Sequence, residues 1–403
     1  MIRRIGALLA ASALIAGLAA CSSSSGSTAG GGQGKGSSIT IGLSIAETGD
    51  EAIPTLLPGY QQAVAQANAA GGVLIGGTRH PVNLVVLDNQ SSTSLLTEQV
   101  HTLALQDHAV ALVSGCCDLN VTEAPLANAL KIPLVGTAIP NELIGKDNGT
   151  WAWNIYIDLF DPGLFTTAVP SLGATNKEVA VIGSSDPEGE GANEVTAEEA
   201  SAGGYKVAVK SLVPIGTTDF SSFIEQAQRA DAQVLVAQMP GPDCFALWKQ
   251  MKALGYVPKV TVANQCGANP TWSQLGSLGN GALLGMNWTP TSGLPDAQAV
   301  AATFNKTYPG DVVDQEAAVT SYTAMEVLLA AISRAGSTSA SAINAAIGQT
   351  NGSFPLGTIK FDASHDWSGS TFLAQWQNGK VVQVYPKAAG ATAEFPPSGL
   401  AGS

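Results

Sequence analysis

The sequence predicts an α/β protein built from two doubly wound parallel-sheet lobes. Short, nearly continuous runs of β-branched apolar residues alternate with helical stretches, as expected for parallel strands covered on both faces. This alternation occurs in two series, one before and one after Trp151. About 365 residues follow the low-complexity N-terminus, which is more than one hydrophobic core organises and enough for two domains.

The first series begins at Ile39. Its apolar runs predict strands over Ile39–Leu43, Val82–Leu87, Val110–Val113 and Ile132–Val135. The gaps between them have helical periodicity, and the first of these helices ends at Gly71-Gly72, a helix stop signal. The predicted helices are Gly59–Ala70, Ser94–Gln106 and Thr122–Leu130.

The second series follows the same rule. Its predicted strands are Glu178–Ile182, Val207–Leu212, Val234–Ala237, Val260–Val262 and Ala282–Gly285. Its predicted helices are Ala192–Ala202, Phe220–Ala230 and Asp243–Leu254. Alternating strands and helices imply parallel sheets with right-handed crossovers, one sheet for each series.

After the second series the pattern changes. Three helices are predicted in succession, over Pro295–Tyr308, Gln315–Ala335 and Ser339–Gln349. Short strands then follow at Thr358–Phe361, Thr371–Gln377 and Val381–Tyr385. Asn378-Gly379 joins the last two strands, and Asn-Gly between alternating apolar residues is a strong signal for a β-hairpin.

The N-terminus carries an export signal. Arg3 and Arg4 precede an apolar stretch, Ile5–Ala20, that is too short to span a membrane but has the length of a signal-peptide core. The stretch ends in Leu-Ala-Ala-Cys21, which resembles the lipobox of bacterial lipoproteins. We therefore expect residues 1–20 to be a lipoprotein signal peptide and Cys21 to be the lipid anchor to the membrane; a plain secretory signal is the alternative. The Ser/Gly-rich residues 21–38 are expected to form a flexible tether.

Charge and cysteine content limit the classes of partner and of bonding that the protein can use. The formal net charge of −13 argues against nucleic acid and against anionic lipid surfaces. Outside the cytoplasm, Cys116, Cys117, Cys244 and Cys266 favour disulfides over a metal site. Cys244 and Cys266 follow consecutive predicted strands, so we expect them to pair. A vicinal disulfide between Cys116 and Cys117 stays open.

The order of elements resembles a known family. It looks like the type I periplasmic-binding fold, in the branched-chain amino acid (leucine-binding) branch of ABC-transporter substrate-binding proteins, over Ile39 to Tyr385. The segments that carry the resemblance are Gly59-Tyr60-Gln61-Gln62-Ala63 with Asn68-Ala69-Ala70-Gly71-Gly72-Val73, Val113-Ser114-Gly115, Val135-Gly136-Thr137-Ala138, Thr218-Asp219-Phe220 and Leu356-Gly357-Thr358-Ile359-Lys360-Phe361-Asp362.

The resemblance implies a two-lobed, Venus-flytrap arrangement. Three hinge crossovers are expected near Asn154–Leu159, Gly285–Thr289 and Asn351–Thr358. Trp151, Trp153 and Trp288 lie near these crossovers, where packing in the hinge is favoured over stacking on a ligand. The expected parts are an N-terminal lobe (39–156 plus 287–353), a C-terminal lobe (157–286 plus 354–388) and a flexible tail (389–403).

Ligands of open α/β sheets bind beyond the carboxyl ends of the strands. The segments that leave those ends are Ala46–Ala52, Gly115–Asn120, Thr137–Asn141, Ser184–Gly191, Gln238–Cys244 and Asn264–Asn269. They could also be ordinary turns. The candidate ligand-binding residues within them are Thr48, Gly49, Cys117, Asp118, Asn120, Thr137, Ala138, Glu188, Gln238, Met239 and Gln265.

The candidate pocket departs from that of amino acid receptors in the family. Gln265 falls where the resemblance places the glutamate that binds the ligand ammonium, and Glu188 and Met239 fall near positions that are often tyrosine. A neutral or polar–apolar small molecule, or an amide or urea-like ligand, is therefore expected. An ammonium group received by Asp118 or Glu188 from another direction remains the alternative.

The sequence carries no credible catalytic set. No histidine falls in the six segments, and neither a G-x-S-x-G elbow nor an HExxH motif occurs. We expect a monomeric, extracytoplasmic solute-binding lipoprotein without cofactor or metal. By resemblance it delivers an amino acid, amide or related small organic solute to the permease and ATPase of an ABC importer. The alternative is a sensor subunit for a membrane signalling receptor.

Overall fold

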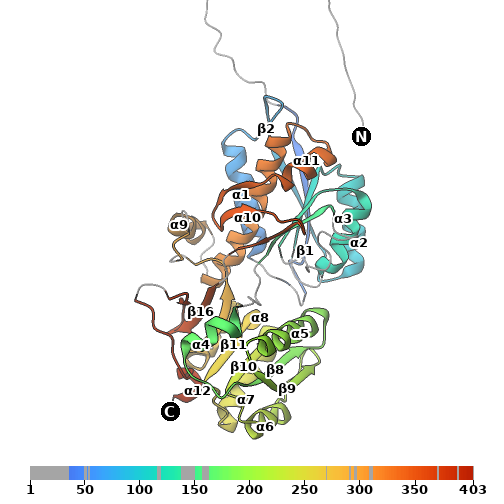
Figure 1. The fold of residues 1–403 in the computed structure, drawn as a ribbon. Coiled ribbons are helices and arrows are strands. Elements are labelled where there is room, and N and C mark those ends of the chain that lie inside the picture. The colour runs from blue at the N-terminus through green and yellow to red at the C-terminus, as the bar shows by residue number, and fades with distance from the viewer. Residues whose placement is uncertain are drawn as a thin grey trace, which may run out of the picture. The chain divides into compact units, whose positions relative to one another are not determined.

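The computed structural model describes two large β-sheets flanked by helices, with two further two-stranded hairpins (Figure 1). The described residues are 36–49, 52, 55–115, 119–137, 150–156, 163–268, 270–289, 292–294, 297–307, 312–369, 372–387 and 390–402. The predicted signal peptide, Cys21 and most of the tether lie outside them. No helix in these ranges is long and apolar enough to cross a membrane.

The first sheet is parallel throughout, in the order β15-β7-β6-β5-β1-β4. Its central strands read as apolar runs because both faces are covered: Ile41 and Leu43 are fully buried, as are Leu112 and Val113 on the neighbouring strand. Its strands are β1 (Ile39–Ile45), β4 (Val82–Asp88), β5 (Ala111–Ser114), β6 (Leu134–Gly136), β7 (Ala152–Tyr156) and β15 (Asp366–Ser368).

Each face of the first sheet has its own helical layer. Apolar residues of α1 (Leu56–Ala69), α10 (Val312–Ala335) and α11 (Ala340–Gly348) share one buried cluster. Those of α2 (Thr93–Leu105) and α3 (Leu119–Leu130) form the cluster on the other face. Helix α9 (Ala297–Thr307) precedes α10, and the hairpin of β2 (Val73–Ile75) and β3 (Thr78–His80) follows α1.

The second sheet has the order β17-β16-β12-β11-β10-β8-β9. Strands β8 to β12 are parallel, whereas β16 and β17 add an antiparallel edge. Its strands are β8 (Glu178–Ser184), β9 (Lys206–Val213), β10 (Val234–Gln238), β11 (Val260–Ala263), β12 (Ala282–Met286), β16 (Phe372–Gln377) and β17 (Lys380–Tyr385). Asn378 and Gly379 have positive φ values of 52° and 72°, which confirms the predicted hairpin.

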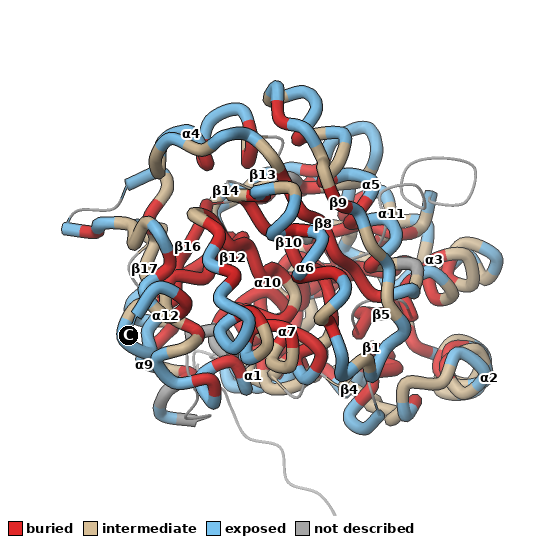
Figure 2. Tube along the Cα trace, turned by 90° about the horizontal axis from the view of Figure 1, so that it is seen from below, coloured by how far each residue is buried: buried red, intermediate tan, exposed pale blue. Residues whose placement is uncertain are grey.

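Helices also cover both faces of the second sheet, and Figure 2 shows the strands as the buried interior. One layer contains the π-helical turn Leu164–Ala168, α4 (Val169–Leu172) and α5 (Pro187–Ala202). The other contains α6 (Ser221–Arg229), α7 (Gly241–Leu254), α8 (Asn264–Gly267) and the 3₁₀ segment Pro270–Gly279. The predicted α/β class with two doubly wound sheets is therefore confirmed.

The third passage between the sheets is not where the sequence predicts it. Residues 351–360 form a hairpin of β13 (Asn351–Phe354) and β14 (Gly357–Lys360), and β15 then joins the first sheet. Phe361 and Trp367 are buried in the first-sheet core. The chain changes sheets only after β15, so the crossover predicted at Asn351–Thr358 is wrong, and residues 354–368 pack with the first lobe. The reason is aromatic packing: His365 stacks on Trp153 with ring centroids 3.7 Å apart.

The C-terminal segment also differs from its prediction as a flexible tail. Leu400, in α12 (Ser398–Ala401), is 2% exposed and belongs to the second-sheet core. The Gly399 amide donates to the Asn280 carbonyl over 3.1 Å, and the Gln375 side-chain amide donates to the Glu394 carbonyl over 3.0 Å. Residues 390–402 are therefore part of the folded body, because they close the open end of its apolar core.

Candidate ligand-binding site

The carboxyl edge of the first sheet brings two of the predicted residues together. The Asn120 side-chain amide donates to the Thr137 carbonyl over 2.8 Å, and the Thr137 hydroxyl donates to the Gly115 carbonyl over 2.8 Å. Both side chains are buried. They lie where β5 passes into α3 and where β6 ends, so the sheet register places loops distant in sequence side by side.

Thr48 and Gly49 lie at the same edge, against a residue that the sequence analysis missed. The Thr48 hydroxyl donates to Asp88 Oδ2 over 2.8 Å, and the Glu47 amide donates to Oδ1 over 3.1 Å. Partial burial alone would raise the pKa of Asp88, but hydrogen bonds from Gln90, Thr48 and Glu47 outweigh it and hold that pKa below its ordinary value. Asp88 was missed because the predicted strand stopped one residue earlier, at Leu87.

A buried acid lies behind this edge. Glu123 of α3 is 1% exposed, and neither carboxyl oxygen has a hydrogen-bond partner in the described part of the chain. Burial raises its pKa to about 8. Burial and the Glu123 charge together raise the pKa of Tyr60, whose hydroxyl donates to the Ser114 carbonyl at the end of β5 over 2.7 Å. The sequence analysis missed Glu123. Its position as a glutamate on the apolar face of the predicted helix Thr122–Leu130 is the feature that could have indicated a buried acid.

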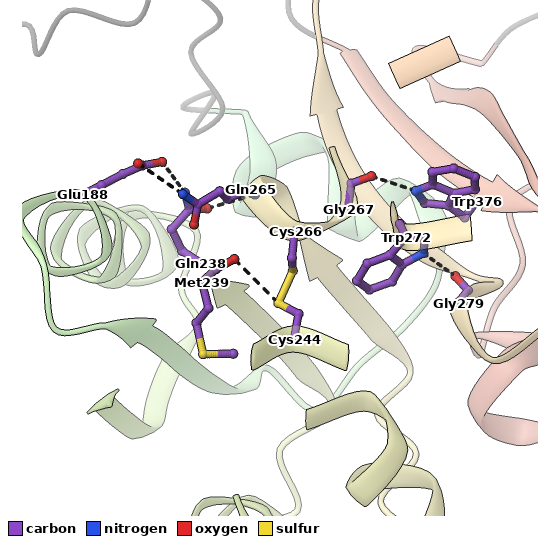
Figure 3. The surroundings of a disulfide bond; sticks show 10 residues. All are labelled: Glu188, Gln238, Met239, Cys244, Gln265, Cys266, Gly267, Trp272, Gly279 and Trp376. Carbon is purple, nitrogen blue, oxygen red and sulfur yellow. Dashed lines mark hydrogen bonds between the residues drawn. A yellow bond between two sulfur atoms is a disulfide. The ribbon is translucent and has the colours of Figure 1, made fainter. Parts of the chain in front are cut away.

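The second sheet edge assembles three predicted residues into one cluster (Figure 3). The Gln238 amide donates to Glu188 Oε1 over 2.8 Å, and the Gln265 amide donates to Oε2 over 3.3 Å. The Gln265 backbone amide donates to Gln238 Oε1 over 3.3 Å. We call Glu188, Gln238 and Gln265 the carboxylate–amide cluster.

Local structure fixes the Glu188 backbone. The Asp186 side chain caps α5 by accepting a hydrogen bond from the Gly189 amide over 2.7 Å. A side chain at Gly189 would place its Cβ 2.2 Å from the Ser184 carbonyl oxygen, so only glycine lets α5 start this close to β8. Glu188 thus lies in the first turn of α5, where the helix dipole favours a negative charge.

The predicted disulfide between Cys244 and Cys266 is confirmed, with the two Cα atoms 6.2 Å apart. It ties the start of α7 to α8, the segments that follow Gln238 and contain Gln265 (Figure 3). Met239 does not join the cluster: it is fully buried in the second-sheet core. Its side chain fills the space beneath the loop instead of facing a ligand.

Further polar groups extend the second edge. Asn264 Oδ1 accepts a hydrogen bond from the Gly285 amide over 3.2 Å, and Glu316 Oε1 accepts one from the Asn287 amide over 3.1 Å. The pKa of Glu316 is raised to about 8 because it is buried. Gln238 ends β10, Asn264 follows β11 and Asn287 follows β12, so three neighbouring strands carry a row of buried amides at their carboxyl ends.

Two of the three tryptophans near the predicted crossovers pack inside the protein, whereas Trp151 is only half-buried. Trp288 is fully buried in the first-sheet core, and Trp153 is 6% exposed, with its indole N–H donating to Asn344 Oδ1 over 2.8 Å. Four of the predicted residues lie outside the described ranges: Cys116, Cys117, Asp118 and Ala138. The vicinal disulfide between Cys116 and Cys117 therefore stays an open prediction. Within the described ranges, no three His, Cys, Asp or Glu side chains gather as metal ligands would.

The chain belongs to the periplasmic binding protein family, whose model matches residues 38–380. Leu/Ile/Val-binding protein homolog 7 from Brucella abortus (strain 2308) is 25% identical over 233 residues, which cover 55% of this chain and 58% of the relative. The chain thus spans less than two thirds of the length of this curated relative.

Solved structures agree on the fold. The leucine-binding protein LivK from Thermotoga maritima superposes with a TM-score of 0.76 at 22% identity, covering 86% of this chain and 97% of that one. LivJ from Streptococcus pneumoniae, solved with isoleucine, gives 0.74 at 20% identity, covering 86% and 99%. A solute-binding protein from R. palustris, solved with benzoate, gives 0.73 at 18% identity, covering 89% and 97%.

These comparisons confirm the predicted type I periplasmic-binding fold. The proteins that the chain matches are binding proteins rather than enzymes, and the family acts outside the cytoplasm. Relatives of the branched-chain amino acid type recur in both comparisons, which confirms the resemblance that the sequence carries.

Proposed function

We propose that this protein is a solute-binding lipoprotein that captures a small organic molecule between its two lobes and delivers it to an ABC importer. The importer would be of the branched-chain amino acid type. The observation that carries the proposal is the gathering of polar side chains at the carboxyl edges of both sheets, on a fold that the family uses for binding.

Capture works by closure of the lobes around the solute. Each sheet edge supplies one half of the site: the Asn120–Thr137 pair on the first and the carboxylate–amide cluster on the second. A solute that contacts both halves stabilises the closed form relative to the open one, because only the closed form makes both sets of contacts. The closed form then docks on the permease.

The membrane anchor is the lipid on Cys21. A Ser/Gly-rich tether at residues 21–38 leaves the folded body free to reach the transporter. Replacement of Cys21 by Ser should move the protein from the detergent phase to the aqueous phase in phase partitioning, while the wild type stays in the detergent phase. Unchanged partitioning of the Cys21→Ser variant would refute the anchor.

Thermal-shift screening of amino acids, amides, ureas and small aromatic acids tests the capture step. A ligand at a hundredfold excess over its Kd stabilises the folded state by about 2.7 kcal/mol, so binding is visible as a saturable rise in Tm. Uptake of the same ligand should fail in cells that lack this protein and return when it is restored. A ligand that binds but whose uptake is independent of the protein would refute delivery while leaving capture intact.

A further inference from the structure

The six segments that follow the strands at the two sheet edges are acidic in sequence. The six segments Ala46–Ala52, Gly115–Asn120, Thr137–Asn141, Ser184–Gly191, Gln238–Cys244 and Asn264–Asn269 contain eight Asp and Glu residues and no Lys, Arg or His. The two ion pairs among the described residues, Lys206–Glu178 and Arg229–Glu225, lie away from these segments. A ligand carboxylate would therefore find no side-chain counter-ion in the segments.

The hydroxyl groups of the first edge are also committed to acceptors within the protein. A hydroxyl has one proton to donate. Thr48 donates its proton to Asp88 over 2.8 Å, Ser114 to the Gly115 carbonyl over 3.2 Å and Thr137 to the same carbonyl over 2.8 Å. None of these three hydroxyls is left to donate to a ligand anion.

One acidic group, in contrast, has no hydrogen-bond partner among the described residues. Glu123 is 1% exposed, its two carboxyl oxygens accept no hydrogen bond from the described residues, and its charge acts on Tyr60, whose hydroxyl lies at the end of β5. Burial without a partner disfavours the charged form of a carboxyl group, and a positive group that reaches Glu123 would favour its ionisation and pair with the carboxylate.

The second edge offers a carboxylate too. The sequence suggested that this edge had lost its negative charge, because Gln265 occupies the position of the expected glutamate. The fold instead brings Glu188, from the first turn of α5, within hydrogen-bonding distance of Gln265. The carboxylate at this edge therefore comes from α5, and the side-chain amides of Gln238 and Gln265 hold it by hydrogen bonds.

We propose that the captured solute is a small organic cation without a free carboxylate, and that Glu123 and Glu188 are its counter-charges on the first and second edges. The inference rests on the proposed function and names its cargo class. Zwitterionic amino acids bring a carboxylate for which the six segments contain no cationic side chain and for which Thr48, Ser114 and Thr137 have no proton left to donate.

A series of probes with one branched carbon skeleton tests the charge requirement. The probes are leucinamide (cation), leucine (zwitterion), 4-methylpentanamide (neutral) and 4-methylpentanoate (anion), with 3-methylbutylamine, putrescine and agmatine as further cations. Titration calorimetry of the full chain in detergent should give a saturable signal with at least one cation. Leucinamide should bind at least tenfold more tightly than leucine.

Tighter binding of leucine or of the anion than of leucinamide overturns the inference and leaves the capture function intact. Binding of 4-methylpentanamide alone, without binding of any cation, also overturns the inference and leaves the capture function intact. If no cation binds, the inference is refuted. If no probe of any class binds, capture itself is contradicted.

Charge-removing variants test the two acids. Glu123→Gln and Glu188→Gln keep the side-chain shape, and each should weaken binding of the cation at least tenfold. Glu194→Gln, an exposed residue of α5 outside the six segments, is the matched control and should change nothing. A folded Glu123→Gln or Glu188→Gln variant with wild-type affinity for the cation would contradict the assignment of that residue.

Proton release separates a counter-charge from a structural role. Burial keeps Glu123 largely protonated at pH 7 in the free protein. Calorimetry at pH 7 in buffers of different ionisation enthalpy should therefore report release of about one proton when the cation binds. Glu123→Gln should release none, whereas Glu123→Asp, which keeps the acid, should restore release. No release by the wild type would refute contact between Glu123 and the cation.

Discussion

At the scale of single residues, the chemistry of this protein lies in acids that the fold has buried. Glu123 and Glu316 are 1% and 4% exposed, and burial raises the pKa of each to about 8. Ordinary glutamates ionise near pH 4.3, so the folded protein holds protons that the unfolded chain releases. Such groups make the folded protein less stable as the pH rises through their range of ionisation.

Stability without ligand should therefore fall between about pH 5 and pH 8. The folded-state pKa values are raised, so over this range the folded state binds more protons than the unfolded state, and the free energy of unfolding decreases with rising pH. Glu123→Gln should remove about 2–4 kcal/mol of this decrease, as measured by urea unfolding at both pH values. Glu194→Gln, on an exposed position of α5, is the control. Parallel profiles for wild type and Glu123→Gln would contradict the raised pKa.

At the scale of elements, close approach between helices decides where the layers sit. Gly59 of α1 faces α10, and a Cβ at this position would lie 2.0 Å from the Ala318 carbonyl oxygen. The contact lets Ser321 donate to the Leu56 carbonyl over 2.7 Å. The glycine is therefore required by the packing of two helices, although both ends of this contact look like ordinary helix sequence.

Gly59→Ala should destabilise the protein by about 1–3 kcal/mol or more, because α1 or α10 must shift to admit the methyl group. Gly191→Ala is the matched control: it also lies in a helix, and its Cβ would meet nothing within 4 Å. That control should be neutral or stabilising by about 0.5–1 kcal/mol through helix propensity. Equal Tm values for the two variants would refute the close contact.

The Cys244–Cys266 disulfide also constrains the elements, since it joins the start of α7 to α8 over a sequence separation of 22 residues. Loop-closure entropy predicts that it contributes about 3 kcal/mol. Reduction should lower the Tm of the wild type by several degrees. The Cys244→Ala, Cys266→Ala double variant should melt at the lower temperature with or without reductant. A wild type that is insensitive to a reductant proven to cleave the bond would contradict this contribution.

At the scale of the whole molecule, the folded body includes residues 390–402. Leu400 closes the second-sheet core, and its carbonyl accepts a hydrogen bond from Lys252 Nζ over 2.9 Å. The first sheet likewise takes in β15 from late in the chain. Residues late in the chain therefore complete both lobes: β15 adds a strand to the first sheet, and Leu400 adds to the core of the second.

Leu400→Ala should cost about 2–4 kcal/mol in unfolding free energy, because it leaves a cavity in a buried cluster. Leu254→Ala provides the comparison, since Leu254 is 43% exposed and its loss should cost well under 1 kcal/mol. Differential scanning calorimetry of both variants measures the difference. If Leu400→Ala melts with the wild type, the segment is the flexible tail that its composition suggests.

The sequence by itself determined the architecture and the disulfide. Periodicity separates strands covered on both faces from helices with one apolar face, so the two series, the three late helices and the Asn378-Gly379 hairpin follow from local chemistry. Consecutive strands of a parallel sheet end at one edge, so the pairing of Cys244 with Cys266 follows as well.

Only the tertiary structure decided which side chains meet. Sequence position made Gln265 look like a lost charge, but the start of α5 brings Glu188 to it from 77 residues away. The third crossover comes after β15 and not at Asn351–Thr358, because β15 pairs with β7 and His365 stacks on Trp153. The sequence around Glu123 also does not show that its carboxyl group lacks a hydrogen-bond partner among the described residues, because partners are set by distance in space. The local sequence pattern determines the helices and strands. Packing between distant segments determines which charged and polar side chains come together at the site.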